Sequence, residues 1–122
     1  MTGSHSNDGP WHRDTYNLNG PSNPLDGTYD DSLVMKLNPF YYTILIPLDD
    51  ITEENGRTEF IVGSHRLTYA ETQNQPHEKN DVKAGSIVVF DGRMIHRACK
   101  HPSQHPRQMI YLVFHRDWYV DV

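Results

Sequence analysis

The sequence predicts an all-β fold, a sandwich or a barrel, and three observations carry that prediction. Short segments rich in β-branched and aromatic residues recur along the chain, as is typical of strands. Turn-forming pairs such as Asn55-Gly56 and Asp91-Gly92 separate these segments. No segment shows the sustained apolar periodicity of a helix. Roughly six or seven short strands at such spacing favour the jelly-roll or cupin-like class.

The bulk properties of the chain narrow the function classes. Its 122 residues are typical of a single domain. The formal net charge is -5 and no run of Lys or Arg stands out, which excludes a nucleic-acid partner. The one cysteine, Cys99, cannot form an internal disulfide, and no charged-then-apolar leader precedes Trp11, so we expect an intracellular, cytoplasmic location. The longest apolar run, at residues 41–48, is too short to cross a bilayer, and no membrane partner is expected.

The N-terminal residues divide into a polar start and the first element of the domain. Residues 1–10 are small and polar and predict a disordered segment, which leaves residues 11–122 as the folded domain. Residues 11–16 are short and partly aromatic, and we expect them to be extended. In an extended segment His12 and Asp14 project from the same face, as ligands of one metal must.

The next elements are expected to be a long loop followed by three strands. Residues 17–31 contain several turn signals and predict a loop that could act as a lid or contact a substrate. Residues 33–37 and 41–48 are expected to be strands, separated by Asn-Pro. The turn at residues 49–56 leads to a further strand at residues 58–62.

The C-terminal half is expected to begin with an irregular surface excursion at residues 65–83, because this stretch is polar and lacks periodicity. Residues 85–90 and 94–99 predict two strands joined by a turn. Residues 107–114 predict the longest strand, which is apolar on both faces and is therefore expected to be central in its sheet. A tail at residues 115–122 follows.

Two histidines and one carboxylate are the candidate metal ligands. An iron(II) site for oxygen activation needs three protein ligands on one face and leaves the other positions open. His12, Asp14 and His96 are of the right types, and the H-x-D spacing fixes the first two locally. The pattern is weak by itself, since residues 115–117 repeat it and a surface histidine beside a surface acid is a common alternative.

Arg107 follows His96 by eleven positions and opens the next expected strand. This spacing places a planar, bidentate cation near the metal on an adjacent strand. Burying an arginine without an anionic partner is costly, so an incoming dicarboxylate is one explanation. An exposed strand start that pairs with solvent or with an acid is the other.

Taken together, these segments resemble the phytanoyl-CoA dioxygenase family of iron(II)/2-oxoglutarate oxygenases. The residues that carry the resemblance are Trp11-His12-Arg13-Asp14, then residues 46–65, which read Ile-Pro-Leu-Asp-Asp-Ile-Thr-Glu-Glu-Asn-Gly-Arg-Thr-Glu-Phe-Ile-Val-Gly-Ser-His, then residues 85–96, Arg107 and Trp118-Tyr119. Their order and spacing cover nearly the whole chain after Pro10. The resemblance implies a double-stranded β-helix.

The resemblance also implies a metal centre and a reaction. His12, Asp14 and His96 are implied as the ligands of iron(II), with 2-oxoglutarate and O2 as co-substrates. Family members that halogenate have a small residue where this chain has Asp14, so the carboxylate favours hydroxylation or a related oxidation. The implied activity is that of a dioxygenase that oxidises a small organic substrate and releases succinate and CO2.

The co-substrate contacts are implied in the same way. Arg107 is implied to hold the distal carboxylate of 2-oxoglutarate, and Thr58 and Thr43 are weaker candidates for contacts with it. Either threonine could instead be an ordinary strand residue. His65 lies in a turn whose geometry Gly63 sets, and we expect it to be structural.

Family members usually carry a long segment before the H-x-D pair that supplies the first barrel strand and supporting helices. We expect this chain to lack that strand and those helices, either as a truncated product or as a chain that completes its sheet as a homodimer through an open edge. The alternative function is a truncated, non-catalytic cupin-like domain that binds a metal or a ligand. A zinc hydrolase would use the same triad but leaves Arg107 unexplained. The substrate stays open between an acyl-CoA, a compatible solute and a secondary metabolite, and the ending of the chain leans toward the last.

Overall fold

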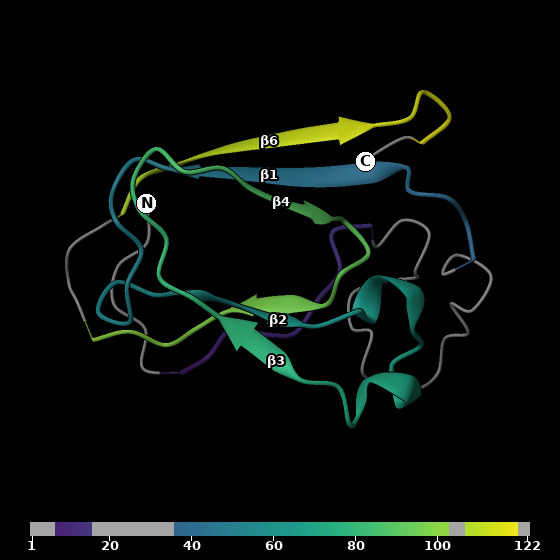
Figure 1. Cartoon of the computed structure of the whole chain (residues 1–122), viewed down its shortest axis with the longest axis horizontal. Coiled ribbons are helices and arrows are strands. Elements are labelled where there is room, and N and C mark those ends of the chain that lie inside the picture. The colour runs from purple at the N-terminus through teal and green to yellow at the C-terminus, as the bar shows by residue number, and fades with distance from the viewer. Residues whose placement is uncertain (1–6, 16–35, 103–106, 120–122) are drawn as a thin grey trace.

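Two three-stranded sheets face each other in the computed structural model, which describes residues 7–15, 36–102 and 107–119 (Figure 1). The upper sheet of Figure 1 has the order β4-β1-β6 and the lower sheet has the order β3-β2-β5. The strands are β1 (Tyr41–Pro47), β2 (Thr58–Ile61), β3 (His77–Lys79), β4 (Val88–Asp91), β5 (His96–Ala98) and β6 (Met109–His115). All the pairings within the sheets are antiparallel. The predicted all-β fold is confirmed.

The space between the sheets is lined by alternate residues of each strand. In β1, Tyr41 and Thr43 are buried whereas Tyr42 is 40% exposed. Thr43 lies opposite Phe90 of β4 and Val113 of β6, so these residues share the inward face. Successive side chains of a strand point to opposite faces, so β1 buries the face of Tyr41 and Thr43 and leaves Tyr42 on the outer face.

The strand β6 was expected to be central, and this prediction was wrong. Within the described residues it pairs with β1 alone and forms one edge of the upper sheet. Its apolar character on both faces has another origin, since Ile110, Leu112 and Phe114 point away from the second sheet and are 43%, 42% and 62% exposed. An apolar run of this kind therefore does not identify a central strand when one sheet face is uncovered.

Strand β3 was missed, because residues 65–83 were expected to be irregular. The stretch from Ser64 onward instead contains two 3₁₀ helices, η1 (Ser64–Arg66) and η2 (Ala70–Thr72), followed by β3. All three residues of β3 are exposed and polar, so they carry no hydrophobic alternation that a sequence pattern could detect. Pairing with β2 forms this strand, and it places Lys79 opposite Glu59, an opposite-charge cross-strand pair.

Other predicted elements differ at their ends or lie outside the described residues. The strands expected at residues 85–90 and 94–99 are present but shorter, as β4 and β5. Of the strand expected at residues 33–37, only Lys36 and Leu37 are described, and they lie in a turn and a bend. The loop expected at residues 17–31 lies outside the described residues. In the part of the chain that is described, no helix has the length and apolar character needed to cross a membrane.

The segment expected to be disordered, residues 1–10, is described from Asn7 onward. Gly9 N–H donates to the Ala98 carbonyl at 2.7 Å, and Lys100 N–H donates to Asp8 Oδ1 at 2.8 Å. Backbone groups of Ala98 and Lys100, in and just after β5, thus bind residues 8 and 9, and the disorder expected of residues 1–10 stays a prediction. Residues 1–6 lie outside the described residues.

Candidate metal centre

His12 and His96 lie directly opposite each other on neighbouring extended segments. Each backbone N–H donates to the other residue's carbonyl at 3.0 Å, which makes an antiparallel bridge between the N-terminal segment and β5. Residues that form such a pair project from the same face. The two imidazole rings are accordingly close, with centroids 4.3 Å apart. The expected extended conformation around His12 is therefore present.

Asp14 brings a carboxylate to the same place. Its Oδ1 lies 3.4 Å from Nε2 of His96 and 3.7 Å from Nε2 of His12. The three ligand atoms all lie within 4.8 Å of one another, and among the described residues this is the group of three that could hold a metal ion. His115 is exposed, and its Nδ1 contacts the Arg116 carbonyl. The structure thus brings together the N-terminal H-x-D pair and His96.

Both histidines are fixed in the tautomer that a metal ligand needs. Nδ1 of His12 lies 3.0 Å from the Pro10 carbonyl, and Nδ1 of His96 lies 2.9 Å from the Met94 carbonyl. A carbonyl oxygen can only accept, so Nδ1 carries a proton in each ring, and Nε2 is the nitrogen that is left to bind a metal. The two Nε2 atoms both face Asp14. Two imidazoles and one carboxylate in this arrangement fit the donor set of a facial triad.

Two hydroxyl groups hold the Asp14 carboxylate from its other side. Thr43 Oγ1 donates to Asp14 Oδ2 at 2.6 Å, and Tyr111 OH donates to the same oxygen at 3.4 Å. Burial would raise the pKa of Asp14, but the hydrogen bond and charge of His96, the Thr43 hydroxyl and the charge of His12 together lower it. Asp14 is thus held ionised with Oδ1 toward the histidines.

Thr43 was expected as a co-substrate contact, and the structure gives its hydroxyl a different partner. The side chain is fully buried, and it contacts Asp14. Tyr111 was not singled out by the sequence at all. Its contact joins residues 97 positions apart, so no local pattern reports it.

Replacing Thr43 with valine should weaken iron(II) binding about tenfold to a hundredfold, the usual effect of losing a partner that orients a metal ligand. Valine has nearly the same shape, so the change removes the hydroxyl donor and leaves the packing. Anaerobic titration of the metal-free protein with iron(II) measures the effect. Thr58→Val is the matched control, since Thr58 lines the neighbouring pocket instead. Wild-type affinity in Thr43→Val would show that the hydroxyl does not support Asp14.

Arg13, between the two ligands of the H-x-D pair, points away from the metal centre and is 3% exposed. Its guanidinium donates to the carbonyls of Ser64, Arg93 and Leu67 at 3.0, 2.5 and 2.8 Å. The segment that carries His12 and Asp14 is thereby tied to the 3₁₀ region and to the turn before β5. In an extended segment the side chain of Arg13 points to the face opposite those of His12 and Asp14, so the sequence alone predicts that Arg13 faces away from the metal centre.

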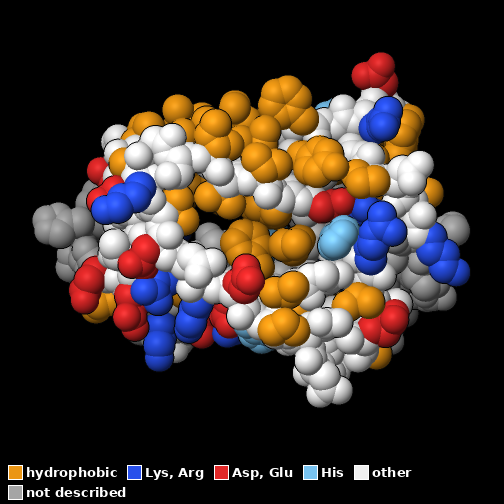
Figure 2. Space-filling model, in the orientation of Figure 1, with side chains coloured by type: hydrophobic (Ala, Val, Ile, Leu, Met, Phe, Trp, Pro, Cys, Tyr) orange, Lys and Arg blue, Asp and Glu red, His pale blue; other side chains and the backbone are white. Residues whose placement is uncertain are grey.

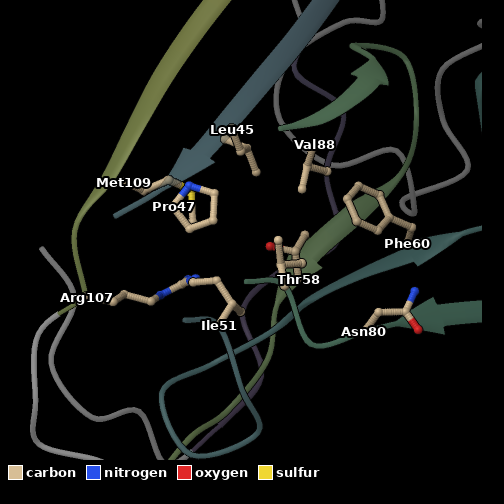
Figure 3. Close-up of a pocket in the computed structure, with 10 residues that line it drawn as sticks. Leu45, Pro47, Ile51, Thr58, Phe60, Asn80, Val88, Arg107 and Met109 are labelled. Carbon is tan, nitrogen blue, oxygen red and sulfur yellow. The ribbon is translucent and has the colours of Figure 1, made fainter. Parts of the chain in front are cut away.

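A pocket of about 180 Å³ lies between the sheets and contains Arg107 and Thr58 (Figure 3). Its other lining residues are mainly apolar: Leu45, Pro47, Ile51, Phe60, Asn80, Val82, Val88 and Met109. Figure 3 shows the Arg107 side chain extending toward Ile51, with Thr58 and Phe60 across from it. The pocket is smaller than the roughly 300–1,000 Å³ of sites for drug-sized ligands, so it suits a small molecule.

Phe60 connects this pocket to the metal centre. It lines the pocket, lies opposite His96 in the register of β2 and β5, and stacks on the His96 ring with centroids 5.9 Å apart. Burial lowers the pKa of Arg107, yet an arginine keeps its charge at any physiological pH. Arg107 thus lies in a mainly apolar pocket that shares Phe60 with the candidate metal centre, and its implied contact with the co-substrate stays a prediction.

The Gly63-Ser64-His65 turn supports the centre from outside it. Gly63 has φ of 76°, a left-handed conformation that glycine adopts without strain. Ser64 is fully buried, and its Oγ accepts a hydrogen bond from Ile95 N–H at 2.7 Å, next to His96. His65 is not among the three candidate ligands, and its structural role stays a prediction.

Comparison with known proteins decides the ancestry. The family described as Phytanoyl-CoA dioxygenase (PhyH) matches residues 2–109 of the chain. The chain belongs to the phytanoyl-CoA dioxygenase family. A curated relative, the iron/alpha-ketoglutarate-dependent dioxygenase ausU of Aspergillus calidoustus, is 29% identical over an alignment of 106 residues, and the match covers 75% of this chain and 35% of that protein. The chain therefore spans about a third of that relative's length.

Solved structures show the fold of this phytanoyl-CoA dioxygenase family chain. AviO1 from Streptomyces viridochromogenes Tue57 superposes with a TM-score of 0.68 at 23% identity, over 97% of this chain and 48% of AviO1. EctD from S. alaskensis, solved with 2-oxoglutarate and 5-hydroxyectoine, has a TM-score of 0.65 at 21% identity, over 93% of this chain and 40% of EctD. These similarities confirm the double-stranded β-helix that the sequence resemblance implied.

Proposed function

We propose that this chain is the β-core of an iron(II)/2-oxoglutarate-dependent dioxygenase that oxidises, by hydroxylation, a small organic substrate. The observation that carries the proposal is the convergence of His12, Asp14 and His96, with both Nε2 atoms turned toward one carboxylate oxygen. When bound, iron(II) with 2-oxoglutarate and O2 supplies the oxidising power, with release of succinate and CO2. Family membership and the iron/alpha-ketoglutarate-dependent relative support the same reaction class.

The residues of the chain have separate tasks in this proposal. The triad holds the metal from one side and leaves the opposite side for the co-substrate and O2. Arg107 binds the distal carboxylate of 2-oxoglutarate through its planar fork, and Thr58, which lines the same pocket, offers a hydroxyl. Leu45, Val88 and the other apolar lining residues exclude water around the co-substrate.

The direct test is co-substrate turnover by the purified chain. We expect succinate to form from 2-oxoglutarate when iron(II) and O2 are both present, and not in the Asp14→Ala variant. Screening acyl-CoA thioesters, compatible solutes and secondary metabolites for enhanced succinate formation then identifies the substrate class. The small molecule found with EctD supports a small organic substrate.

A second candidate is a non-catalytic domain that binds a metal or ligand. The observation that favours it is the outer face of the β4-β1-β6 sheet, where Tyr42, Val89, Ile110, Leu112 and Phe114 are all at least 40% exposed. Hydrophobic side chains gather over this sheet in Figure 2. Tight binding of iron(II) and 2-oxoglutarate without succinate release would select this candidate.

We propose the edge of the upper sheet at β6, which has no second partner strand among the described residues, as the homodimer contact. This seven-residue strand carries no Lys, Pro or acidic residue that would block pairing. Two antiparallel copies centred on Leu112 would place Ile110 opposite Phe114 of the second copy, an apolar pair on one face.

Leu112→Lys should convert a dimer of the chain into a monomer at micromolar concentration, because it places two like charges face to face at the centre of the contact. Sedimentation velocity over a dilution series measures the effect. Leu48→Lys is the control, since Leu48 is 52% exposed and lies outside β6. A wild-type chain that stays monomeric at all concentrations would reject the edge contact.

A further inference from the structure

A second group of side chains lies behind the two metal-ligating histidines, on the outside of the β3-β2-β5 sheet. Trp11 precedes His12, Arg97 follows His96, and Glu59 precedes Phe60, which stacks on His96. Successive side chains of a strand point to opposite faces. The side chains of Trp11, Arg97 and Glu59 therefore lie together on the outer face, as those of their neighbours His12, His96 and Phe60 do on the inner face. We call these three residues the brace.

The members of the brace contact one another closely. Arg97 Cζ lies 4.1 Å from the centroid of the Trp11 ring, a cation–π contact. Arg97 Nε donates to Glu59 Oε1 at 2.8 Å, and the two residues are direct cross-strand partners of β5 and β2. Glu59 is 6% exposed. A chain of contacts therefore runs from the N-terminal segment through β5 to β2.

Two further residues close this cluster. Nδ1 of His77 lies 3.0 Å from Glu59 Oε2, and the His77 ring meets Trp11 edge-on with centroids 5.2 Å apart. Asp8 Oδ2 lies 3.4 Å from Arg97 Nη2. Burial would raise the pKa of Glu59, but its bonds to Arg97 and His77 lower it, so Glu59 stays ionised and orients the guanidinium. Trp11 thus packs against a cation whose position is fixed from two sides.

The backbone pairing around His12 is short. Its segment forms one isolated bridge with β5, that between His12 and His96, and single backbone hydrogen bonds run from Gly9 N–H to Ala98 and from Asp14 N–H to Gly92 on either side of it. The Arg13 guanidinium adds bonds to the carbonyls of Ser64 and Leu67. A slip of one residue along β5 would turn His12 to the outer face and remove it from the metal centre. The contact of Trp11 with Arg97 adds a side-chain tie on the outer face that exists in one register only, because a slip would also turn Trp11 to the inner face.

We propose that Trp11, Arg97 and Glu59 are positioning residues that hold His12 in register with His96, so that both imidazoles face the metal. This inference rests on the proposed function, in that the inner face is taken to bind iron(II). The brace itself is a property of the metal-free chain. Its effect on backbone pairing and its effect on metal affinity are therefore measured separately.

The test compares Trp11→Ala, Trp11→Phe and Arg97→Lys with the wild type. In the metal-free chain, Trp11→Ala should speed amide hydrogen exchange at His12 and His96 by about threefold to thirtyfold, the range expected for loss of one cation–π contact. The amides of β1 and β6 should keep their wild-type rates. Iron(II) affinity should fall by a similar factor. Trp11→Phe keeps an aromatic face, so its exchange rates and its iron(II) affinity should be close to those of the wild type. Arg97→Lys keeps only the charge, so both quantities should lie further from the wild type.

Arg57→Ala is the matched control. Arg57 Nε and Asp81 Oδ1 form an ion pair of the same kind at 2.8 Å, just before β2 and apart from the brace. The Arg57→Ala variant should show the wild-type exchange rate at the His12 amide and the wild-type iron(II) affinity. The proposal is overturned if Trp11→Ala leaves both the amide exchange rates and the iron(II) affinity within twofold of wild type. It is also overturned if exchange rises evenly over the whole chain, which would indicate general destabilisation. Should the wild type fail to bind iron(II), the proposed function fails, and the exchange rates still decide the brace.

Discussion

Asp14→Ala is expected to abolish iron(II) binding, with a loss of more than about 100-fold in affinity, because even the partners that orient metal ligands contribute that much. His12→Ala and His96→Ala should have the same effect, since each removes one of three ligand atoms that lie within 4.8 Å of one another. Anaerobic titration of the metal-free protein measures the affinities. Melting temperature of the metal-free variants separates loss of a ligand from loss of the fold.

The C-terminal repeat of the H-x-D pattern supplies the control for this prediction. His115→Ala and Asp117→Ala change the same residue types at the same spacing, but His115 is exposed and neither belongs to the metal group. Both variants should bind iron(II) as the wild type does. If they proved as damaging as the N-terminal variants, the choice of ligands would be wrong.

Arg107→Lys is expected to weaken 2-oxoglutarate binding about tenfold to a hundredfold while iron(II) affinity stays within a few-fold. The guanidinium can form two parallel hydrogen bonds with a carboxylate, whereas lysine offers a point charge. Charge-assisted bonds contribute roughly 1.5–3 kcal/mol, and about 1.4 kcal/mol corresponds to one decade in affinity. The half-buried position of Arg107 in a mainly apolar pocket adds to the cost of a poorly matched partner.

Anaerobic titration with 2-oxoglutarate, monitored together with the melting temperature, measures this effect. Arg57→Lys is the matched control, because Arg57 pairs with Asp81 and does not line the pocket. A lower melting temperature with unchanged 2-oxoglutarate affinity in Arg107→Lys would make Arg107 a structural residue and reject its assignment to the co-substrate.

The proximity of His12 and Asp14 could be predicted from the sequence because their geometry is local, whereas His96 was added by type and by the family resemblance. His12 and Asp14 share a face at a spacing of two, and His96 follows a strand and a turn that the pattern of apolar residues and Asp91-Gly92 indicated. Strands could be predicted for the same reason where β-branched and aromatic residues are consecutive in the chain, as in β1. Both kinds of signal depend on neighbours in the chain.

The features that were missed depend on contacts between distant residues. Strand β3 is polar throughout and forms because β2 offers it backbone partners. The hydroxyl of Thr43 reaches Asp14 because β1 crosses behind the N-terminal segment, which no spacing in the sequence reports. The edge position of β6 was hidden by its apolar outer face, since apolar residues at the surface and in a central strand produce the same pattern.

The metal centre joins distant parts of the described chain, because His12 lies near its start and His96 follows β4. If His12, Asp14 and His96 hold iron(II) as proposed, a chain whose N-terminal segment is not paired with β5 lacks two of the three ligands. Metal binding would then stabilise the paired form. We therefore expect added iron(II) to raise the resistance of the N-terminal segment to proteolysis.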